Sequence, residues 1–233
     1  MIELRDVSRI YRRGADPVHA LDHVTLHLEP ARFSALMGPS GSGKSTLLNL
    51  IAGLDRPSSG SVEVAGTCLN ELSDDELAAF RARHIGFVFQ FFNLIPVLDA
   101  RRNVELPLLL THLRRKEREE RARTALRLVG IADRAEHLPA ALSGGEQQRV
   151  AIARAIISDP EIVVADEPTG DLDAKSASEV LELLHELTER FGKTVVMVTH
   201  DPRSERFVDE TFHLDKGVLV KPATANTTAE ASR

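Results

Sequence analysis

The chain has 233 residues, of which 42% are hydrophobic and 27% charged, a composition typical of a globular protein rather than a disordered or fibrous one. Its formal net charge of −6 gives no support to a sequence-independent grip on nucleic acid, which relies on excess Lys and Arg. The single cysteine, Cys68, cannot form an internal disulfide, so we interpret it as an inert packing residue in a reducing cytoplasm.

A chain of this length is expected to form one domain, or one domain with a subdomain. Residues 1–5 lack the pattern of a signal peptide, and no apolar run approaches the ~20 residues that span a bilayer. We therefore expect any membrane role to come through a partner.

The first predicted elements are two strands and a helix. Residues 24–28 alternate between apolar and polar, which predicts a half-buried strand. Residues 33–37 predict a second strand that leads into a glycine-rich turn, and residues 47–51 follow at helical density. The histidines of this region, His19, His23 and His27, have helical spacing, but the strand pattern argues against a helix and hence against a metal site there.

Further short elements follow. Strands are expected at residues 61–64 and 85–89. Between them, Ser73 and Glu76 form a capping box, which predicts the start of a helix over residues 74–83.

From about residue 99 to residue 142 the pattern indicates a helical insertion. Residues 114–121 carry opposite charges three and four positions apart, as on the solvated face of a helix. Beyond it, the apolar runs at 162–165 and 195–198 flank a helical stretch over 174–190. Such runs favour parallel strands covered by helices on both faces. The tail, 221–233, lacks large apolar residues and is expected to be disordered.

The strongest local motif lies at residues 38–46, which match the phosphate-binding pattern G-x-x-x-x-G-K-[ST] between a predicted strand and a predicted helix. Its backbone amides would point at phosphate oxygens, Lys44 would reach the β- and γ-phosphates, and the Ser45 hydroxyl would ligate Mg²⁺. The nucleotide-binding residues predicted from this loop are Gly38, Ser40, Gly41, Gly43, Lys44, Ser45 and Thr46.

A second acidic site follows the apolar run at residues 162–165. Asp166 and Glu167 would emerge at the carboxyl end of a buried strand, where ligands of open α/β sheets collect. We predict that Asp166 holds hydrated Mg²⁺ and that Glu167 orients or deprotonates an attacking water.

With these two sites, the stretch Leu-Ser-Gly-Gly-Glu-Gln-Gln-Arg at residues 142–149 closely resembles the signature of ATP-binding-cassette (ABC) ATPases. The resemblance covers about residues 1–220, and the motifs occur in the family's order. It implies an α/β fold of the P-loop NTPase type as a single domain, with a RecA-like, mainly parallel core sheet. An N-terminal antiparallel β subdomain and an α-helical subdomain at about residues 91–145 complete it.

The resemblance also implies roles for further residues. Gln90 resembles the glutamine that ends a strand and senses Mg²⁺, and His200 the switch histidine on the γ-phosphate. Asp173 corresponds to the aspartate of the loop that crosses between subunits, and Tyr11 to the aromatic residue stacked on adenine. The catalytic set is then Glu167, His200 and Gln90, and the metal set is Ser45, Gln90 and Asp166.

The signature turn implies a dimer. Ser143, Gly144 and Gly145 precede a predicted helix and so provide a second donor-rich cradle for phosphate. In the family, two subunits pack head to tail, so that Ser143 of one copy completes the ATP site around Lys44 of the other. A nucleic-acid partner is not expected.

The apolar stretch after Gln90 is interpreted as a docking surface for integral membrane permease subunits near Phe91, Phe92 and Leu94, the alternative being subdomain core. Residues 103–108 and 166–173 resemble the branch of lipoprotein-releasing, macrolide-exporting and cell-division cassette ATPases, although Asp171 departs from that branch's usual asparagine. The resemblance implies an ATPase subunit of a membrane ABC transporter, peripheral at the cytoplasmic face of the inner membrane.

Other functions remain as alternatives. A non-transport cassette ATPase would generally carry two cassettes or long inserted coils, and an importer subunit would more often carry serine-alanine at residues 170–171. A module that binds ATP without hydrolysing it would have no use for Glu167, Gln90 and His200.

Overall fold

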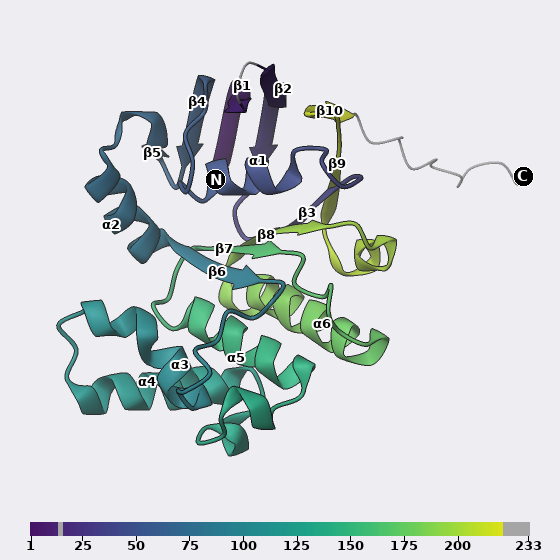
Figure 1. The fold of residues 1–233 in the computed structure, drawn as a ribbon. Coiled ribbons are helices and arrows are strands. Elements are labelled where there is room, and N and C mark those ends of the chain that lie inside the picture. The colour runs from purple at the N-terminus through teal and green to yellow at the C-terminus, as the bar shows by residue number, and fades with distance from the viewer. Residues whose placement is uncertain (14–15, 221–233) are drawn as a thin grey trace, which may run out of the picture.

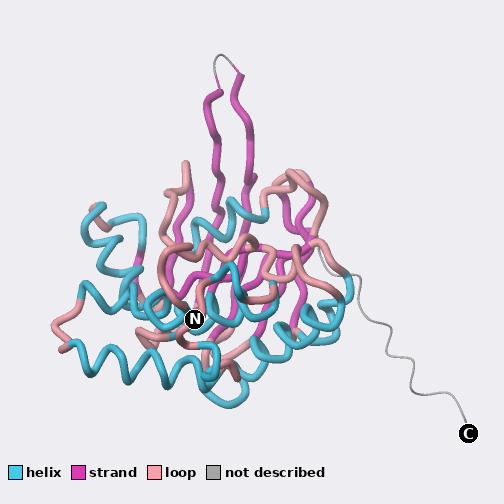
Figure 2. The backbone as a smooth tube through the Cα atoms, turned by 60° about the horizontal axis from the view of Figure 1, so that its bottom comes forward, coloured by secondary structure: helices cyan, strands magenta, loops and turns pink. Residues whose placement is uncertain are grey.

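The computed structural model describes residues 1–13 and 16–220, which contain two β-sheets and two groups of helices (Figure 1). The smaller sheet has the strand order β2-β1-β4-β5 and is antiparallel. Its strands are β1 (Ile2–Arg13), β2 (Asp16–Leu28), β4 (Ser59–Val64) and β5 (Thr67–Cys68). The hairpin of β1 and β2 projects beyond the rest of the chain (Figure 2).

The larger sheet has the order β10-β9-β3-β8-β7-β6 and is parallel except for β10. Its strands are β3 (Phe33–Met37), β6 (Ile85–Phe89), β7 (Ile162–Asp166), β8 (Thr194–Thr199), β9 (Glu210–Asp215) and β10 (Val218–Val220). Every residue of β3 and β8 is buried, as expected for parallel strands that are covered on both faces.

Alternate residues of the parallel strands enter two hydrophobic cores. Ala35 and Met197 belong to the core shared with the helices that follow β6, whereas Leu36 and Val198 belong to the core shared with helix α1 (Lys44–Ile51) and the antiparallel sheet. Because side chains along a strand point to opposite faces, the core sheet separates two layers (Figure 1). The edge of this sheet where β3, β7 and β8 end is left for the functional site.

The remaining helices lie mostly on the side of the core sheet away from α1 (Figure 1). They are α3 (Ala100–Glu105), α4 (Arg115–Leu128), α5 (Gly144–Ile156) and α6 (Ala174–Phe191), while α2 (Asp74–His84) precedes β6. Short 3-10 turns cover Leu69–Glu71, Leu106–Leu110, Ala132–Arg134, Pro139–Ala141 and Pro202–Phe207. The segment between β6 and α5 is therefore helical, as predicted.

Several sequence predictions are confirmed in detail. Val24, Leu26 and Leu28 are buried on one face of β2, and α2 begins with both hydrogen bonds of the predicted capping box. The charged segment forms α4, which buries its small and apolar face and leaves ion pairs such as Arg115 with Glu119 on the surface.

Four strands, β1, β5, β9 and β10, were not predicted from the sequence, and the predicted start of β2 was too late. The pairing of β1 with β2 contains three register shifts, which interrupt the alternation of apolar and polar residues on which the prediction depended. The predicted disorder of residues 221–233 lies outside the described residues.

Candidate functional site

The phosphate-binding loop joins the buried strand β3 to α1. Gly43, the residue before the helix, has φ of 101°, and a Cβ placed on it would lie 2.3 Å from the carbonyl oxygen of Ala20, so only glycine fits. The Lys44 side chain is buried, and its Nζ donates to the carbonyl oxygens of Gly38 at 2.8 Å and Pro39 at 3.0 Å. The loop thus wraps around its own lysine.

A hollow of about 650 Å³ opens over this loop. Four chain segments besides the loop and the start of α1 reach it: β2 and the ends of β6, β7 and β8. The lining residues are Val18, His19, Ala20, Pro39, Ser40, Gly41, Gly43, Lys44, Ser45, Thr46, Gln90, Glu167 and His200. The fold therefore brings most of the predicted phosphate-loop residues together with all three predicted catalytic residues.

Two of the three predicted metal ligands, Ser45 and Asp166, are in contact, and Ser45 lines this hollow. Ser45 Oγ donates to Asp166 Oδ1 at 3.3 Å, and Gln90 lines the same space. Burial raises the pKa of Asp166, and the neighbouring Glu167 raises it further, while the Ser45 hydroxyl and Lys44 lower it. Hydroxyl, carboxylate and amide oxygens are hard donors of the kind that Mg²⁺ prefers, so the donor set fits this ion.

Glu167 and His200 form a pair at the ends of β7 and β8. The Glu167 backbone has φ of 48°, in the left-handed region, and its N–H donates to the carbonyl oxygen of Val198 at 2.9 Å. His200 Nδ1 lies 3.0 Å from Glu167 Oε1 and 2.9 Å from Oε2. A left-handed backbone at a non-glycine residue stores strain, which is frequent where a side chain must be aimed.

The serine-glycine-glycine turn lies elsewhere. Ser143 is exposed and caps α5: its Oγ accepts from the Glu146 N–H at 3.2 Å, and its own N–H donates to Glu146 Oε2 at 2.8 Å. These contacts with Ser143 lower the pKa of Glu146, and Arg134 adds to the effect. None of Ser143, Gly144 and Gly145 is among the residues that line the hollow over Lys44.

Asp173 lies beside that turn and is also absent from the lining of the hollow. Its carboxylate caps α6 by accepting from the N–H groups of Lys175 and Ser176. The two helix starts are close together, because a Cβ placed on Gly145 would lie 3.0 Å from Ser176 Oγ. The turn and the aspartate thus form one surface with two helix N-termini.

Tyr11 is not among the lining residues either. Its hydroxyl donates to Asp55 Oδ2 at 2.6 Å, and the Arg9 guanidinium lies 4.5 Å above the centre of its ring. Asp55 also accepts from Arg9, so the three side chains form a closed group beside the β1–β2 hairpin. The adenine-stacking role of Tyr11 stays a prediction.

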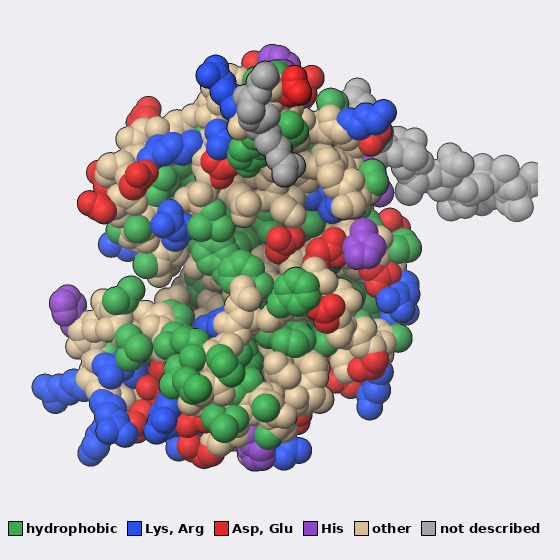
Figure 3. Space-filling model, in the orientation of Figure 1, with side chains coloured by type: hydrophobic (Ala, Val, Ile, Leu, Met, Phe, Trp, Pro, Cys, Tyr) green, Lys and Arg blue, Asp and Glu red, His purple; other side chains and the backbone are tan. Residues whose placement is uncertain are grey.

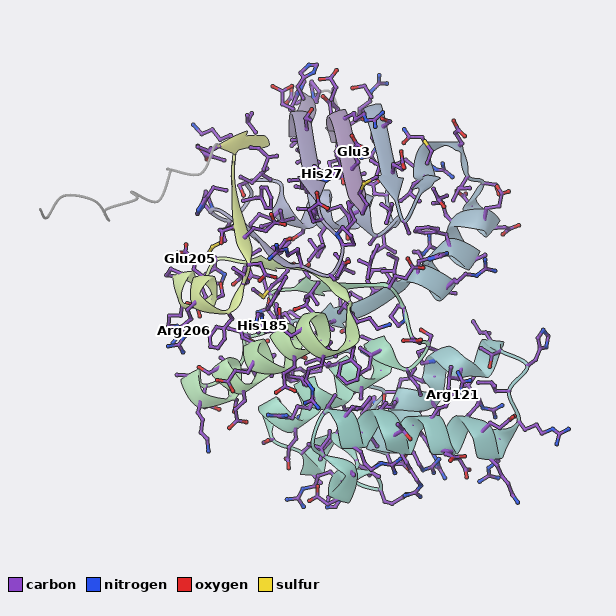
Figure 4. The ribbon with its side chains drawn as sticks, turned by 180° about the vertical axis from the view of Figure 1, so that it is seen from behind. Glu3, His27, Arg121, His185, Glu205 and Arg206 are labelled. Atoms are coloured by element: carbon purple, nitrogen blue, oxygen red, sulfur yellow. The ribbon has the colours of Figure 1, made fainter. Side chains whose placement is uncertain are left out.

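The three histidines of β2 have separate surroundings. His19 lines the hollow, His23 pairs with Asp6, and His27 pairs with Glu29. His27 lies opposite Glu3 on the neighbouring strand, on the face shown in Figure 4. In the described part of the chain, no cluster of three or more His, Cys, Asp or Glu side chains could hold a metal ion.

The segment after Gln90 divides between surface and core. Phe91 is 72% exposed, whereas Leu94 packs against the helical core and Phe92 is half-buried. Hydrophobic side chains gather over the helical part and the groove below β6 on the face shown in Figure 3. That groove is lined by apolar residues that include Phe87, Phe89 and Leu110.

Two residues of this region, Gln148 and Arg154 on α5, were not predicted from the sequence. Gln148 is completely buried and Arg154 partly so, and both donate to backbone carbonyls next to predicted site residues. One feature of the sequence could have indicated Gln148. It lies one helical turn before the apolar Ile152, and therefore on the same face of the helix, where a polar side chain is unusual.

A model of the ABC transporter family matches residues 21–170. The lipoprotein-releasing system ATP-binding protein LolD of Chromohalobacter salexigens is 46% identical over 96% of this chain and 94% of its own. The macrolide export ATP-binding/permease protein MacB of Rhodopseudomonas palustris is 47% identical over 100% of this chain and 36% of its own.

A solved structure gives the same result. The dimeric structure of the ATP-binding cassette MJ0796 of Methanocaldococcus jannaschii, in a post-hydrolysis state bound to ADP and Pi, matches with a TM-score of 0.86. The match has 45% sequence identity and covers 94% of this chain and 96% of that one. The expected P-loop fold is thereby confirmed.

Among the residues that the structure describes, no helix is both long and apolar enough to cross a membrane. The family model spans the phosphate loop, Gln90, the serine-glycine-glycine turn and the Asp166–Glu167 pair. This chain therefore belongs to the ABC transporter family, as one of its ATP-binding proteins and an ATPase.

Proposed function

We propose that the protein is the ATP-hydrolysing subunit of a membrane transporter and that two copies pack head to tail around two ATP molecules. One observation carries the proposal: the hollow over Lys44 and the surface at Ser143 and Asp173 are separate parts of one chain. A helix N-terminus with free amides attracts phosphate, so a second copy can complete the site. The dimeric structure of MJ0796 with ADP and Pi supports this arrangement.

Each phosphate contact has a structural basis. Lys44 Nζ donates to the carbonyl oxygens of Gly38 and Pro39, and ATP phosphates would replace these acceptors with charged ones. Ser45, Asp166 and Gln90 would hold Mg²⁺, which supplies positive charge against the β- and γ-phosphate oxygens when it is bound.

Glu167 has the position required of a general base. Its carboxylate enters the hollow beside His200, and it would accept the proton of the attacking water at one oxygen while His200 Nδ1 orients the other. The other ring nitrogen of His200, Nε2, would then be left to contact the γ-phosphate, as the sequence resemblance implies.

We further propose an integral membrane permease as the partner. The name of MacB of R. palustris assigns ATP-binding and permease functions to one protein. The name of LolD of C. salexigens refers to a lipoprotein-releasing system. The exposed Phe91 and the apolar groove below β6 offer a docking surface next to Gln90. The chain would then lie at the cytoplasmic face of the membrane and act in export, lipoprotein or lipid extraction, or force transmission.

Light scattering of the Glu167→Gln variant with ATP and Mg²⁺ tests the shared site. We expect a dimer with ATP and a monomer without it. Adding Ser143→Arg to Glu167→Gln should abolish the dimer but keep ATP binding, whereas Ser59→Arg, at an exposed serine of β4, should change neither. A stable ATP dimer of the Ser143→Arg variant would refute the proposal.

A further inference from the structure

Helix α5 contacts both loops that surround the predicted γ-phosphate position. The helix begins at the serine-glycine-glycine turn and passes behind β6 and β7. Gln148 is 0% exposed, and its Nε2 donates to the carbonyl oxygen of Pro168 at 2.6 Å and to that of Phe89 at 3.3 Å. Pro168 directly follows Glu167, and Phe89 directly precedes Gln90. One buried amide therefore joins the backbones of both catalytic loops to α5.

Arg154 makes a second connection two turns further along α5. Its Nη1 and Nη2 donate to the carbonyl oxygens of Asn93 at 2.5 Å and Phe92 at 2.7 Å. Both of these residues have left-handed backbones, with φ of 49° and 57°. The guanidinium makes no ion pair within residues 1–13 and 16–220, so carbonyl groups supply its hydrogen bonds there. A charged donor satisfied by a strained turn holds that turn in one conformation.

The backbones of α5 and β6 are closely packed, which leaves little room for one to move without the other. A Cβ placed on Gly86 of β6 would lie 2.3 Å from the carbonyl oxygen of Ala155, so the strand and α5 are in direct backbone contact. On the other side, a Cβ placed on Gly170 would lie 2.9 Å from Gln90 Nε2. Closely packed contacts of this kind transmit small displacements rather than absorb them.

We propose that Gln148 and Arg154 are positioning residues that keep Glu167 and Gln90 in register with the serine-glycine-glycine turn of the same chain. The inference rests on the proposed function, because the turn is taken to bind the ATP held by the partner copy. Closure of the turn onto that ATP then moves α5, and α5 sets the geometry of its own chain's Glu167 and Gln90. Each site thereby senses whether the other is filled.

Gln148→Met tests the first connection, because methionine has a similar volume but no N–H donor. We expect kcat to fall by up to about 100-fold, the effect of misplacing a catalytic group by about 1 Å, with the Kd for ATP within about twofold of the parent. Ile152→Val is the matched control: it removes one methylene from a completely buried side chain of α5, so it lowers the melting temperature but leaves kcat unchanged.

Arg154→Met tests the second connection. Loosening the Gln90 loop should raise the Mg²⁺ concentration that gives half-maximal turnover, while the Kd for ATP in EDTA stays unchanged. Arg154→Lys keeps a donor and should restore part of the Mg²⁺ response; if the methionine variant fails to fold, the lysine variant should show a smaller shift in the same direction.

A folded Gln148→Met variant with the parent's kcat, or a folded Arg154→Met variant with the parent's Mg²⁺ response, would overturn the inference. Failure of the proposed function gives a different result. In that case Glu167→Gln itself would hydrolyse ATP like the parent, or its ATP dimer would not form, whatever the two α5 variants do.

Discussion

His200 Nδ1 lies 2.9 Å from Glu167 Oε2, although 33 positions separate the two residues in the chain. They meet because β7 and β8 are adjacent parallel strands and both end at the edge of the sheet that carries the phosphate loop. The N–H of Glu167 continues the ladder by donating to Val198, which fixes the carboxylate beside the histidine. The two side chains therefore pair with each other at this edge of the sheet.

Glu167 is expected to act as the general base of ATP hydrolysis. Glu167→Gln should lower turnover by about 10²- to 10⁴-fold, the usual contribution of general-base catalysis, because an amide cannot accept the proton. Steady-state phosphate release and fluorescent-ATP titration measure the two quantities. ATP affinity should persist, since Lys44 and the loop amides remain. Parent-like phosphate release would remove Glu167 from the mechanism.

The burial of Asp166 leads us to expect that the stability of the nucleotide-free protein depends on pH. Burial raises the pKa of its carboxyl above the ordinary value, so folding favours the neutral acid. That favourable contribution is complete below the ordinary aspartate value and is lost as the pH rises through the raised pKa. Asp166→Asn should therefore have a higher melting temperature than the parent at neutral pH.

The difference in melting temperature should shrink as the pH is lowered toward the ordinary aspartate range. Thermal unfolding in EDTA, without nucleotide, checks this, with the exposed Asp171→Asn as control. An Asp166→Asn variant that is less stable than the parent at neutral pH would contradict the burial argument. Mg²⁺-dependent turnover should be lost in the same variant, because the proposed cation ligand is gone.

Because Tyr11 is predicted to stack on adenine, its loss should weaken the binding of the base and leave the binding of the phosphates unchanged. Tyr11→Ala should weaken ATP binding by about 1–3 kcal/mol, the usual value for stacking on a base, and should leave the binding of tripolyphosphate unchanged. Tyr11→Phe keeps the ring and loses only the hydrogen bond to Asp55. Calorimetric titration with both ligands checks this, and equal ATP affinity of the alanine variant would exclude stacking.

We expect the exposed Phe91 ring to contribute to the binding of the protein to membranes. Phe91→Ser removes an exposed ring from the proposed docking surface and should lower the fraction that sediments with native membranes. The matched control is Phe191→Ser at the end of α6, where the ring is 44% exposed and does not belong to the segment that follows Gln90. Equal loss from both variants would point to nonspecific adsorption instead of docking.

Contiguous features could be determined from the sequence. The phosphate loop and the caps at Ser73 and Ser143 depend on residues within a few positions of each other, so their local backbone chemistry can be recognised without a fold. The buried runs in β3, β7 and β8 could also be predicted, because both faces of a parallel strand are apolar.

Contacts between residues that are far apart in the sequence depend on the tertiary structure. Ser45 meets Asp166 across 121 positions, and Gln148 meets Pro168 and Phe89 across 20 and 59. Strand order and helix packing create these contacts, and no local periodicity encodes them. The same reason explains why β1, β5, β9 and β10 were not predicted: pairing with neighbouring strands, as well as their own patterns, holds them in the sheets.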